Sequence, residues 1–228
     1  MLLHLKHLLN ADELQRLRAL LGEEAPWVDG AASAGAQAVA RKHNRQLAQD
    51  SEPSREARAI VLGALQRDPL FFSAALPRRI FNPLFNAYRA PGEHYGAHID
   101  NAVMHSRASG EWVRSDLSCT VFLSEPDSYD GGELVVHHSM GRQRVKLAAG
   151  DAVLYPGTSL HEVTPVTRGE RLASFFWIES MVRGDEQRRV LFDLDMNLLR
   201  LRARDGESDE ATGLSGVYHN LLRLWAQP

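Results

Sequence analysis

Apolar residues alternate with polar ones, or form short apolar runs, through most of residues 79–180. This pattern is typical of β-strands, because successive side chains of a strand point to opposite faces of a sheet. Glycine, proline and aspartate separate the segments at turn positions. About eight short strands at this spacing favour a sandwich or jelly roll, an architecture that shelters the edges of its sheets.

Helical periodicity flanks the strand-rich part on both sides. Residues 2–9 predict a short strand, whereas the pattern over 29–50 is weak. Helices are predicted over about 11–24, 53–68, 185–203 and 210–225. The sequence therefore predicts a mainly β protein with flanking helices in three parts: an N-terminal strand and helices over 1–78, a β core over 79–181 and a helical extension over 182–228.

Composition and charge exclude several classes of protein. Of the 228 residues, 44% are hydrophobic and 24% charged, and the net charge of -3 gives no reason to expect nucleic-acid binding. No stretch approaches the roughly 18 uninterrupted apolar residues of a membrane span. His4, Lys6 and His7 interrupt the apolar start and acidic residues follow it, so we expect no signal peptide. The single cysteine, Cys119, fits a reducing compartment. We expect a cytoplasmic protein that contacts neither nucleic acid nor membrane.

Three potential metal ligands lie in the strand-rich part: His98 and Asp100 in GEHYGAHIDNAV, and His161 in PGTSLHEV. If His98 and Asp100 share a strand, both side chains project from one face, and the strands that follow could bring His161 to the same place. Two imidazoles and one carboxylate form the facial triad of non-haem Fe(II) oxygenases, which leaves metal positions open. A zinc site, or buried polar residues that satisfy one another, are the alternatives.

Arg171 follows His161 by ten residues, on what we predict to be the partner strand of a hairpin. Strand alternation puts Arg171, Ala173, Phe175 and Trp177 on one face. An arginine among apolar neighbours is costly unless its charge is paired, and the sequence shows no obvious carboxylate partner. An anionic co-substrate clamped by the guanidinium would solve the problem. A structural salt bridge is the alternative.

Other polar residues have simpler interpretations. His94 and His105 flank the metal segment and could support it from behind, although ordinary surface positions are more common. His137 and His138 close an apolar strand and are expected to face solvent. The basic stretch 41–45 is too short to indicate nucleic-acid binding, and we expect it to solvate a loop near a substrate at most.

The segments GGELVVHH, VKLAAGDAVLYPGTSLHEVTPVTRGERLASFFWIESMVR and DEQRRVLFDLD resemble the bacterial PKHD-type hydroxylases, a group of the prolyl-4-hydroxylase-like Fe(II)/2-oxoglutarate dioxygenases. The resemblance covers nearly the whole chain, including the helical tail. It implies a double-stranded β-helix (jelly-roll) core, Fe(II) at His98, Asp100 and His161, and 2-oxoglutarate held through Arg171. The co-substrates would be 2-oxoglutarate and O2, with L-ascorbate as an auxiliary reductant.

The resemblance implies less about other positions. Tyr88, ten residues before His98, matches a tyrosine that hydrogen-bonds 2-oxoglutarate in related prolyl hydroxylases, and Trp177 matches an aromatic residue that lines the same pocket. Phe175 departs from the pattern, because some relatives carry a hydroxyl residue there. The group is also associated with iron-responsive genes and siderophore uptake, which suggests a role but no substrate.

The leading hypothesis is therefore an Fe(II)- and 2-oxoglutarate-dependent hydroxylase that releases succinate and CO2. A jelly-roll isomerase or hydrolase that uses zinc or manganese is the second hypothesis, and a non-catalytic iron- or ligand-sensing module is the third. The substrate is a small molecule, peptide or protein that fold-level analogy cannot identify. Apolar stripes on the C-terminal helices favour packing on the core, with a subunit interface of a homo-oligomer as the alternative.

Overall fold

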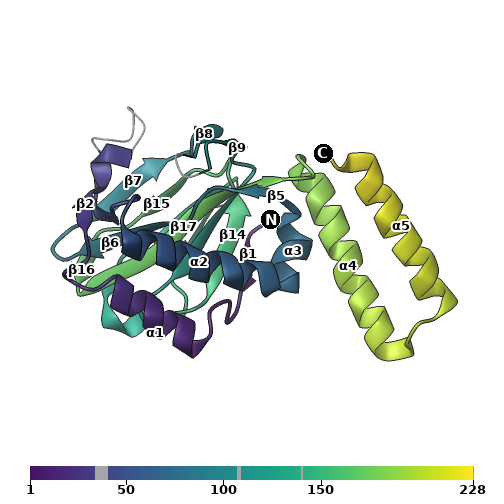
Figure 1. The fold of residues 1–228 in the computed structure, drawn as a ribbon. Helices are drawn as coiled ribbons and strands as arrows, with labels where there is room; N and C mark the ends of the chain where they lie inside the picture. The colour runs from purple at the N-terminus through teal and green to yellow at the C-terminus, as the bar shows by residue number, and fades with distance from the viewer. Residues whose placement is uncertain (34–40, 107–108, 140, 228) are drawn as a thin grey trace.

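The computed structural model describes residues 1–33, 41–106, 109–139 and 141–227, and two facing β-sheets form its centre (Figure 1). The large sheet contains, in spatial order, β1 (Leu3–Leu5), β14 (Ala152–Pro156), β10 (Leu117–Phe122), β17 (Glu170–Ser180), β6 (Leu84–Arg89), β4 (Arg45–Leu47) and β2 (Trp27–Asp29), with β5 (Pro77–Ile80) paired to β17. The small sheet contains β13 (Gly141–Val145), β12 (Leu134–His138), β15 (His161–Val163), β7 (His94–His98) and β3 (Lys42–His43).

All strand pairs of both sheets are antiparallel. Two short ribbons complete the β structure: β8 (Val103–His105) with β9 (Trp112–Arg114), and β11 (Asp130–Gly131) with β16 (Val166–Arg168). Apolar side chains from both sheets meet between them, for example Phe122 and Val153 from the large sheet with Leu134 and Val136 from the small one. The jelly-roll prediction is confirmed.

Three helices cover the outer face of the large sheet (Figure 1): α1 (Ala11–Leu20), α2 (Glu52–Arg67) and α3 (Pro69–Ala75). Asn10 begins α1 with a reciprocal capping box to Glu13, and the Ser51 hydroxyl caps α2. The apolar faces of these helices bury most of the largest hydrophobic cluster against the sheet. Burial of that cluster is what holds the helices in place, since short helices are marginal alone.

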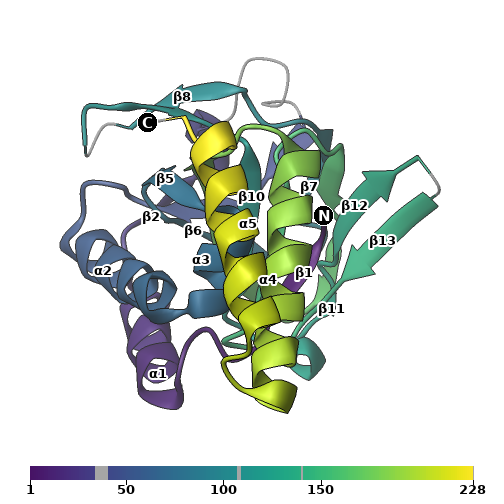
Figure 2. The same cartoon turned by 90° about the vertical axis from the view of Figure 1, so that its right-hand side faces the viewer.

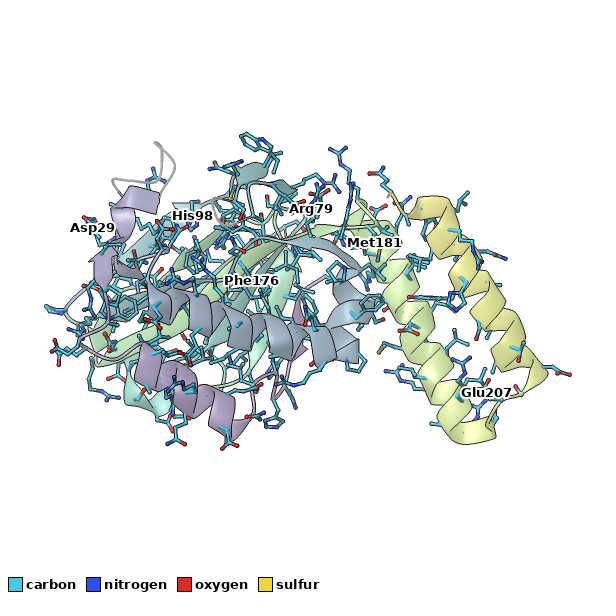
Figure 3. All side chains as sticks on the ribbon, viewed as in Figure 1. Asp29, Arg79, His98, Phe176, Met181 and Glu207 are labelled. Carbon is cyan, nitrogen blue, oxygen red and sulfur yellow. The ribbon has the colours of Figure 1, made fainter. Side chains whose placement is uncertain are left out.

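Two helices at the C-terminal end, α4 (Asp185–Asp205) and α5 (Asp209–Trp225), form a helical hairpin that stands away from the sheets (Figures 1 and 2). The hairpin contacts the rest of the molecule through α3 and the end of β17. Its tip at Glu207 lies at the opposite end of the molecule from His98 (Figure 3). The helix predictions for this region are confirmed within two residues, and the three-part division of the chain stays a prediction.

Several local expectations were wrong. The N-terminal strand spans only Leu3–Leu5, and α1 ends at Leu20 because the following Gly22 and Pro26 disfavour a helix. Residues 68–75 form an unpredicted helix, in which Asp68 caps the first turn and Pro69 occupies the first helical position. The weakly patterned segment 29–50 contains β3, β4 and the last residue of β2, and its residues 34–40 lie outside the described part.

The hairpin that we predicted between the segments of His161 and Arg171 does not exist. The strand of His161, β15, pairs with β12 and β7 in the small sheet, whereas the strand of Arg171, β17, pairs with β10 and β6 in the large sheet. The chain between them passes through β16, which pairs with β11. His161 and Arg171 therefore approach the interior from opposite sheets.

Candidate metal centre and adjoining pocket

The three predicted metal ligands lie together at one end of the space between the sheets. His98 ends β7 and His161 begins β15, and the two residues are directly paired in the antiparallel ladder. Their Nε2 atoms lie 3.9 and 3.8 Å from the two carboxylate oxygens of Asp100. One ligand atom from each residue falls within 4.8 Å of the others, a spacing that can hold a metal ion.

Backbone carbonyls fix the orientation of both imidazoles. His98 donates from Nδ1 to the carbonyl of Gly96 at 2.8 Å, and His161 donates in the same way to Ser159 at 3.0 Å. With Nδ1 protonated, Nε2 of each ring carries the lone pair that a metal needs. This assignment of the tautomers follows from the acceptors, since a carbonyl oxygen can only accept.

We had predicted that Asp100 lies on the strand of His98. The structure places it two residues beyond the end of that strand. Its carboxylate is oriented by the hydroxyl of Ser118 on β10, which donates to Oδ2 at 2.8 Å. From this loop position the carboxylate faces both imidazoles, with one oxygen near Nε2 of each ring. Ser118 is a supporting residue that no sequence motif indicated.

Electrostatics keep the site ready for a cation. Burial lowers the pKa of His98 to about 4, and the neighbouring His161 acts in the same direction. His98 is therefore neutral at physiological pH, the form in which imidazole binds metals. Two imidazoles and one carboxylate on one side of an ion are the donor set of the 2-His-1-carboxylate facial triad.

Arg171 lies deep in the same interior and is only 1% exposed. The guanidinium packs between the rings of Tyr88 and Phe122, with its carbon 5.3 and 5.5 Å from their centroids. Its Nε and Nη1 atoms have no hydrogen-bond partner among the described residues. A buried, unpaired guanidinium is strongly unfavourable, so a structural salt bridge does not explain Arg171, whereas an anionic ligand does.

Two further groups complete the surroundings of Arg171. The hydroxyl of Tyr129, a fully buried residue, has no hydrogen-bond partner among the described residues. Burial raises the pKa of Tyr129, and the Arg171 guanidinium opposes this. A Cβ atom on Gly132, whose φ is 61°, would lie 3.1 Å from Cδ of Arg171 and 3.0 Å from Tyr129. The second glycine of GGEL thus leaves room for the arginine.

Tyr88 and Trp177 occupy two different parts of the pocket. Tyr88 pairs directly with Arg171 across β6 and β17 and is 1% exposed. Burial raises its pKa to about 12, so that the phenol remains a hydrogen-bond donor at neutral pH. Trp177 lies six residues further along β17, edge-on to Phe175 and Phe81. Both residues line the cavity.

A single cavity of about 400 Å³ connects the metal ligands with Arg171. Its aromatic and apolar lining includes Tyr95, Tyr155, Phe175, Trp177, Met104 and Ile99. Tyr95 stacks on His98 with ring centroids 3.6 Å apart. The charged side chains that line it, in the part of the chain described, are Asp100, Arg171, Arg41 and Lys42.

Lys42 lines the pocket, but the sequence analysis considered it only as part of the basic stretch 41–45 and did not name it as a site residue. It is only 4% exposed and belongs to the basic stretch that we had assigned to a solvated loop. Burial lowers the pKa of Lys42 to about 8, while the carboxylates of Asp100 and Asp29 act against that shift, so most of the amine is protonated at neutral pH. Lys42, Asn44 and Gln46 are buried in alternation along this segment, but all residues from 41 to 46 are polar, so the sequence carries no signal for which side faces inward.

The remaining histidines do not join the site. His94 lies against His43, with ring centroids 5.0 Å apart, and bonds the Gly92 carbonyl, whereas His105 lies against Trp112. His137 pairs with Glu162 at 3.2 Å on the small sheet. Cys119 is buried, as predicted. No helix in the described ranges is both long and apolar enough to cross a bilayer.

Comparisons with known families agree with this geometry. Residues 83–179 match the 2OG-Fe(II) oxygenase superfamily, and residues 185–227 match the C-terminal domain of PKHD-type hydroxylases. The chain is 57% identical to a PKHD-type hydroxylase of Polaromonas sp. over 226 residues, with 99% of each protein covered. It is 53% identical to another from Rhizorhabdus wittichii, with both proteins covered completely.

Two solved structures have similar folds. One is an oxidoreductase of the 2OG-Fe(II) oxygenase family from Burkholderia pseudomallei, with a TM-score of 0.55 and 23% identity over 77% of this chain and 84% of that one. Another is a prolyl hydroxylase from Trichoplax adhaerens in complex with a hypoxia-inducible-factor peptide, with a TM-score of 0.57 and 15% identity over 83% and 86% of the two chains. These likenesses establish the fold.

Proposed function

The chain belongs to the PKHD-type hydroxylases of the 2OG-Fe(II) oxygenase superfamily, and from that premise we propose that His98, Asp100 and His161 bind its catalytic Fe(II). The family's chemistry requires Fe(II), 2-oxoglutarate and O2. One oxygen atom enters succinate as 2-oxoglutarate loses CO2, and the other enters a C–H bond of the substrate as a hydroxyl group. Iron, when bound, supplies the site at which these two oxidations are coupled.

In this proposal Arg171 binds the C5 carboxylate of 2-oxoglutarate. The guanidinium donates its unpaired N–H groups to the carboxylate oxygens, and the neighbouring hydroxyls of Tyr88 and Tyr129 donate to the same group. The position between two aromatic rings prevents the arginine from moving away. Because Arg171 lies deep in the cavity, it would hold the C5 end of 2-oxoglutarate there, and the other end of the co-substrate would face the three metal ligands.

The observation that carries the proposal is the combination of a metal-competent triad with a fully buried cation in one cavity. In a zinc or manganese isomerase or hydrolase the arginine would bind a substrate anion instead, so dependence of turnover on O2 and 2-oxoglutarate separates the two functions. Trp177, lying nearer Phe175 than Arg171, is assigned to the part of the wall that faces substrate.

The decisive experiment measures succinate formed from 2-oxoglutarate by the enzyme reconstituted anaerobically with Fe(II) and then exposed to O2. Arg171→Met should raise the KM for 2-oxoglutarate about 100-fold, because charge-assisted hydrogen bonds contribute about 1.5–3 kcal/mol each. Arg168→Met is the matched control, since Arg168 lies exposed on β16 and pairs with Asp130. An unchanged KM in the Arg171 variant would refute the clamp, and activity with zinc but not iron would favour the hydrolase.

Three further aspects of the proposal rest on the family resemblance rather than on geometry. Ascorbate is expected to maintain turnover by keeping iron ferrous, which a time course with and without ascorbate tests. A link to iron or siderophore uptake predicts higher expression under iron limitation. A cytoplasmic location accords with one buried, unpaired cysteine, and cell fractionation tests it.

A further inference from the structure

Large apolar side chains remain exposed on both helices of the C-terminal hairpin, which stands away from the sheets (Figures 1 and 2). Leu224 is 76% exposed and Val217 48%. With their neighbours they form two rows at helical spacing, one on each helix: Val190, Leu194 and Leu201 on α4, and Leu214, Val217, Leu221 and Leu224 on α5. We call these two rows the outer face of the hairpin.

Helix periodicity places the α4 row on the side of that helix that is turned away from the core. Phe192 and Met196 of α4 pack in the main hydrophobic cluster, which lies against the large sheet. At about 100° per residue, Leu201 lies half a turn from Phe192, and Val190 is separated from Phe192 by a similar angle. Burial against the core therefore accounts for one side of α4 and leaves the row on the other side uncovered.

The rows of the two helices lie on the same side of the hairpin. The antiparallel helices meet through Arg202, which donates to the Ser215 hydroxyl at 2.8 Å, and through the apolar cluster around Leu191. Leu201 directly precedes Arg202, and Leu214 directly precedes Ser215. In an antiparallel pair of right-handed helices, the residues that precede the contact positions fall on one side of the pair. The outer face is therefore continuous and two helices wide.

A glycine beside the α5 row indicates that another backbone approaches there. Gly213 lies inside α5, one residue before Leu214, and a Cβ atom on it would meet no atom of the described chain within 4 Å. Glycine destabilises an exposed helix relative to alanine, and packing within the described chain gives no reason for it. The close approach of a second helix gives such a reason, since only glycine leaves the backbone uncovered.

The charges on the hairpin indicate which partner covers the outer face. Glu186 and Glu210 each lie four residues before the first apolar residue of a row, and Arg200 and Arg223 directly precede the last one. In the described part of the chain none of the four forms an ion pair, and the two arginines bond to asparagines of their own helices. Antiparallel packing brings the acidic start of one helix to the basic end of another. A second copy of the hairpin offers this complementary pattern.

We propose that the outer face joins two copies of this chain, whose hairpins form a four-helix bundle. The apolar rows of both copies meet in the centre of the bundle, and the acidic start of each helix lies towards the basic end of a helix of the other copy. A two-fold arrangement uses the same surface on both copies. The hairpin tip at Glu207 lies far from His98 (Figure 3), so the inference is independent of the proposed function.

Sedimentation velocity of the full chain over a series of concentrations tests the proposal. The wild-type protein should sediment with the mass of two chains at about 100 µM and dissociate on dilution. Val217→Glu should raise the dissociation constant of the dimer at least about 100-fold, because each dimer would bury two unpaired carboxylates. Leu199→Glu is the matched control, since Leu199 is similarly exposed but lies on α4 outside the two rows. A wild-type protein with the mass of one chain at every concentration would overturn the inference.

Gly213→Leu separates association from folding. Within one copy the new side chain has open space and α5 gains helix propensity, so the melting temperature of the dilute, monomeric protein should stay the same or rise. The dissociation constant should rise at least about tenfold, because the side chain would separate the two backbones. Gly216→Leu is the matched control, at an equally open glycine on the polar side of α5. A dimer that tolerates both Gly213→Leu and Val217→Glu would show that another surface joins the copies, which would also overturn the inference.

Discussion

The β core and the C-terminal helical hairpin bury different kinds of side chain. Between the sheets the chain buries an arginine, a histidine, a lysine and an asparagine around a cavity, and several of their polar atoms have no partner among the described residues. Where the hairpin meets the core, by contrast, Leu76, Val182 and Leu191 form a small apolar cluster. The buried Arg188 there donates to the carbonyls of Val182 and Arg183 at 2.7 and 2.8 Å.

This difference indicates that the β core carries the chemistry, whereas the junction serves to attach the helical hairpin. Partners missing inside the core indicate a ligand that must arrive, because folding alone does not tolerate many unsatisfied buried groups. At the junction with the hairpin most of the polar groups named here bond within the chain, including a bond from the Gln227 amide to the Met181 carbonyl at 2.7 Å, and Nε of Arg188 is the exception. We therefore expect changes in the core to affect turnover, and changes in the hairpin to affect stability or association.

The largest effect is expected from Asp100→Ala, which removes the sole carboxylate of the triad. Loss of a metal ligand should cost more than the about 10–100-fold typical of an outer-shell partner, so both iron content and succinate formation should fall at least about 100-fold. The unfolding midpoint of the metal-free protein should change little, since Asp100 lies in the loop after β7 and the structure gives its side chain one hydrogen bond, from Ser118. Asp130→Ala, at an exposed carboxylate, is the control. Full iron content in the Asp100 variant would contradict the assignment.

Leu191→Ala tests the other side of the comparison. Leu191 is fully buried on α4 beside Leu76 and Val182, and truncation of a buried leucine costs about 2–5 kcal/mol of unfolding free energy. Leu199→Ala, at a half-exposed position of the same helix, should cost under about 0.5 kcal/mol. Urea unfolding measures both. Turnover per folded molecule should stay at the wild-type value, and a large loss of turnover would show that the hairpin acts on the active site.

Tyr129→Phe should have a smaller effect, confined to the co-substrate. Removal of the hydroxyl beside Arg171 deletes one hydrogen bond to the proposed carboxylate, so the KM for 2-oxoglutarate should rise about tenfold while kcat changes less. Tyr218→Phe on α5 is the matched control, being half-buried and far from the cavity. If both variants keep the wild-type KM, Tyr129 contributes only packing.

The sequence predicted the metal ligands and the buried arginine, but it did not predict the arrangement of the side chains around them. His98, Asp100, His161 and Arg171 stood out because few residue types bind iron or a buried anion, and the structure brings all four to one cavity. It did not predict that Tyr95 and His98, three residues apart, would stack within the interior. That arrangement needs a shift of register between β7 and β15, a bulge that side-chain alternation alone cannot reveal.

Residues that act across long sequence distances were missed for the same reason. Tyr129 precedes the strand ribbon β11 and reaches Arg171 only after the two sheets have closed on each other. Lys42 lies on a two-residue strand. Its inward direction is set by pairing with Tyr95, a residue far away in the sequence. Periodicity reports the burial of a segment, whereas these positions depend on which segments become neighbours.

The smallest effect on stability is expected from Leu224→Ser on α5. Leu224 is 76% exposed, and Leu214 and Val217 are also exposed on the same helix, so the change should alter the unfolding free energy by less than about 0.5 kcal/mol. The sequence-based prediction of a subunit interface on these helices gives a second readout. If α5 is that interface, light scattering should show a lower molar mass for the variant than for the wild-type protein. Equal molar masses would mean that the exposed leucine contributes neither to the fold nor to an assembly.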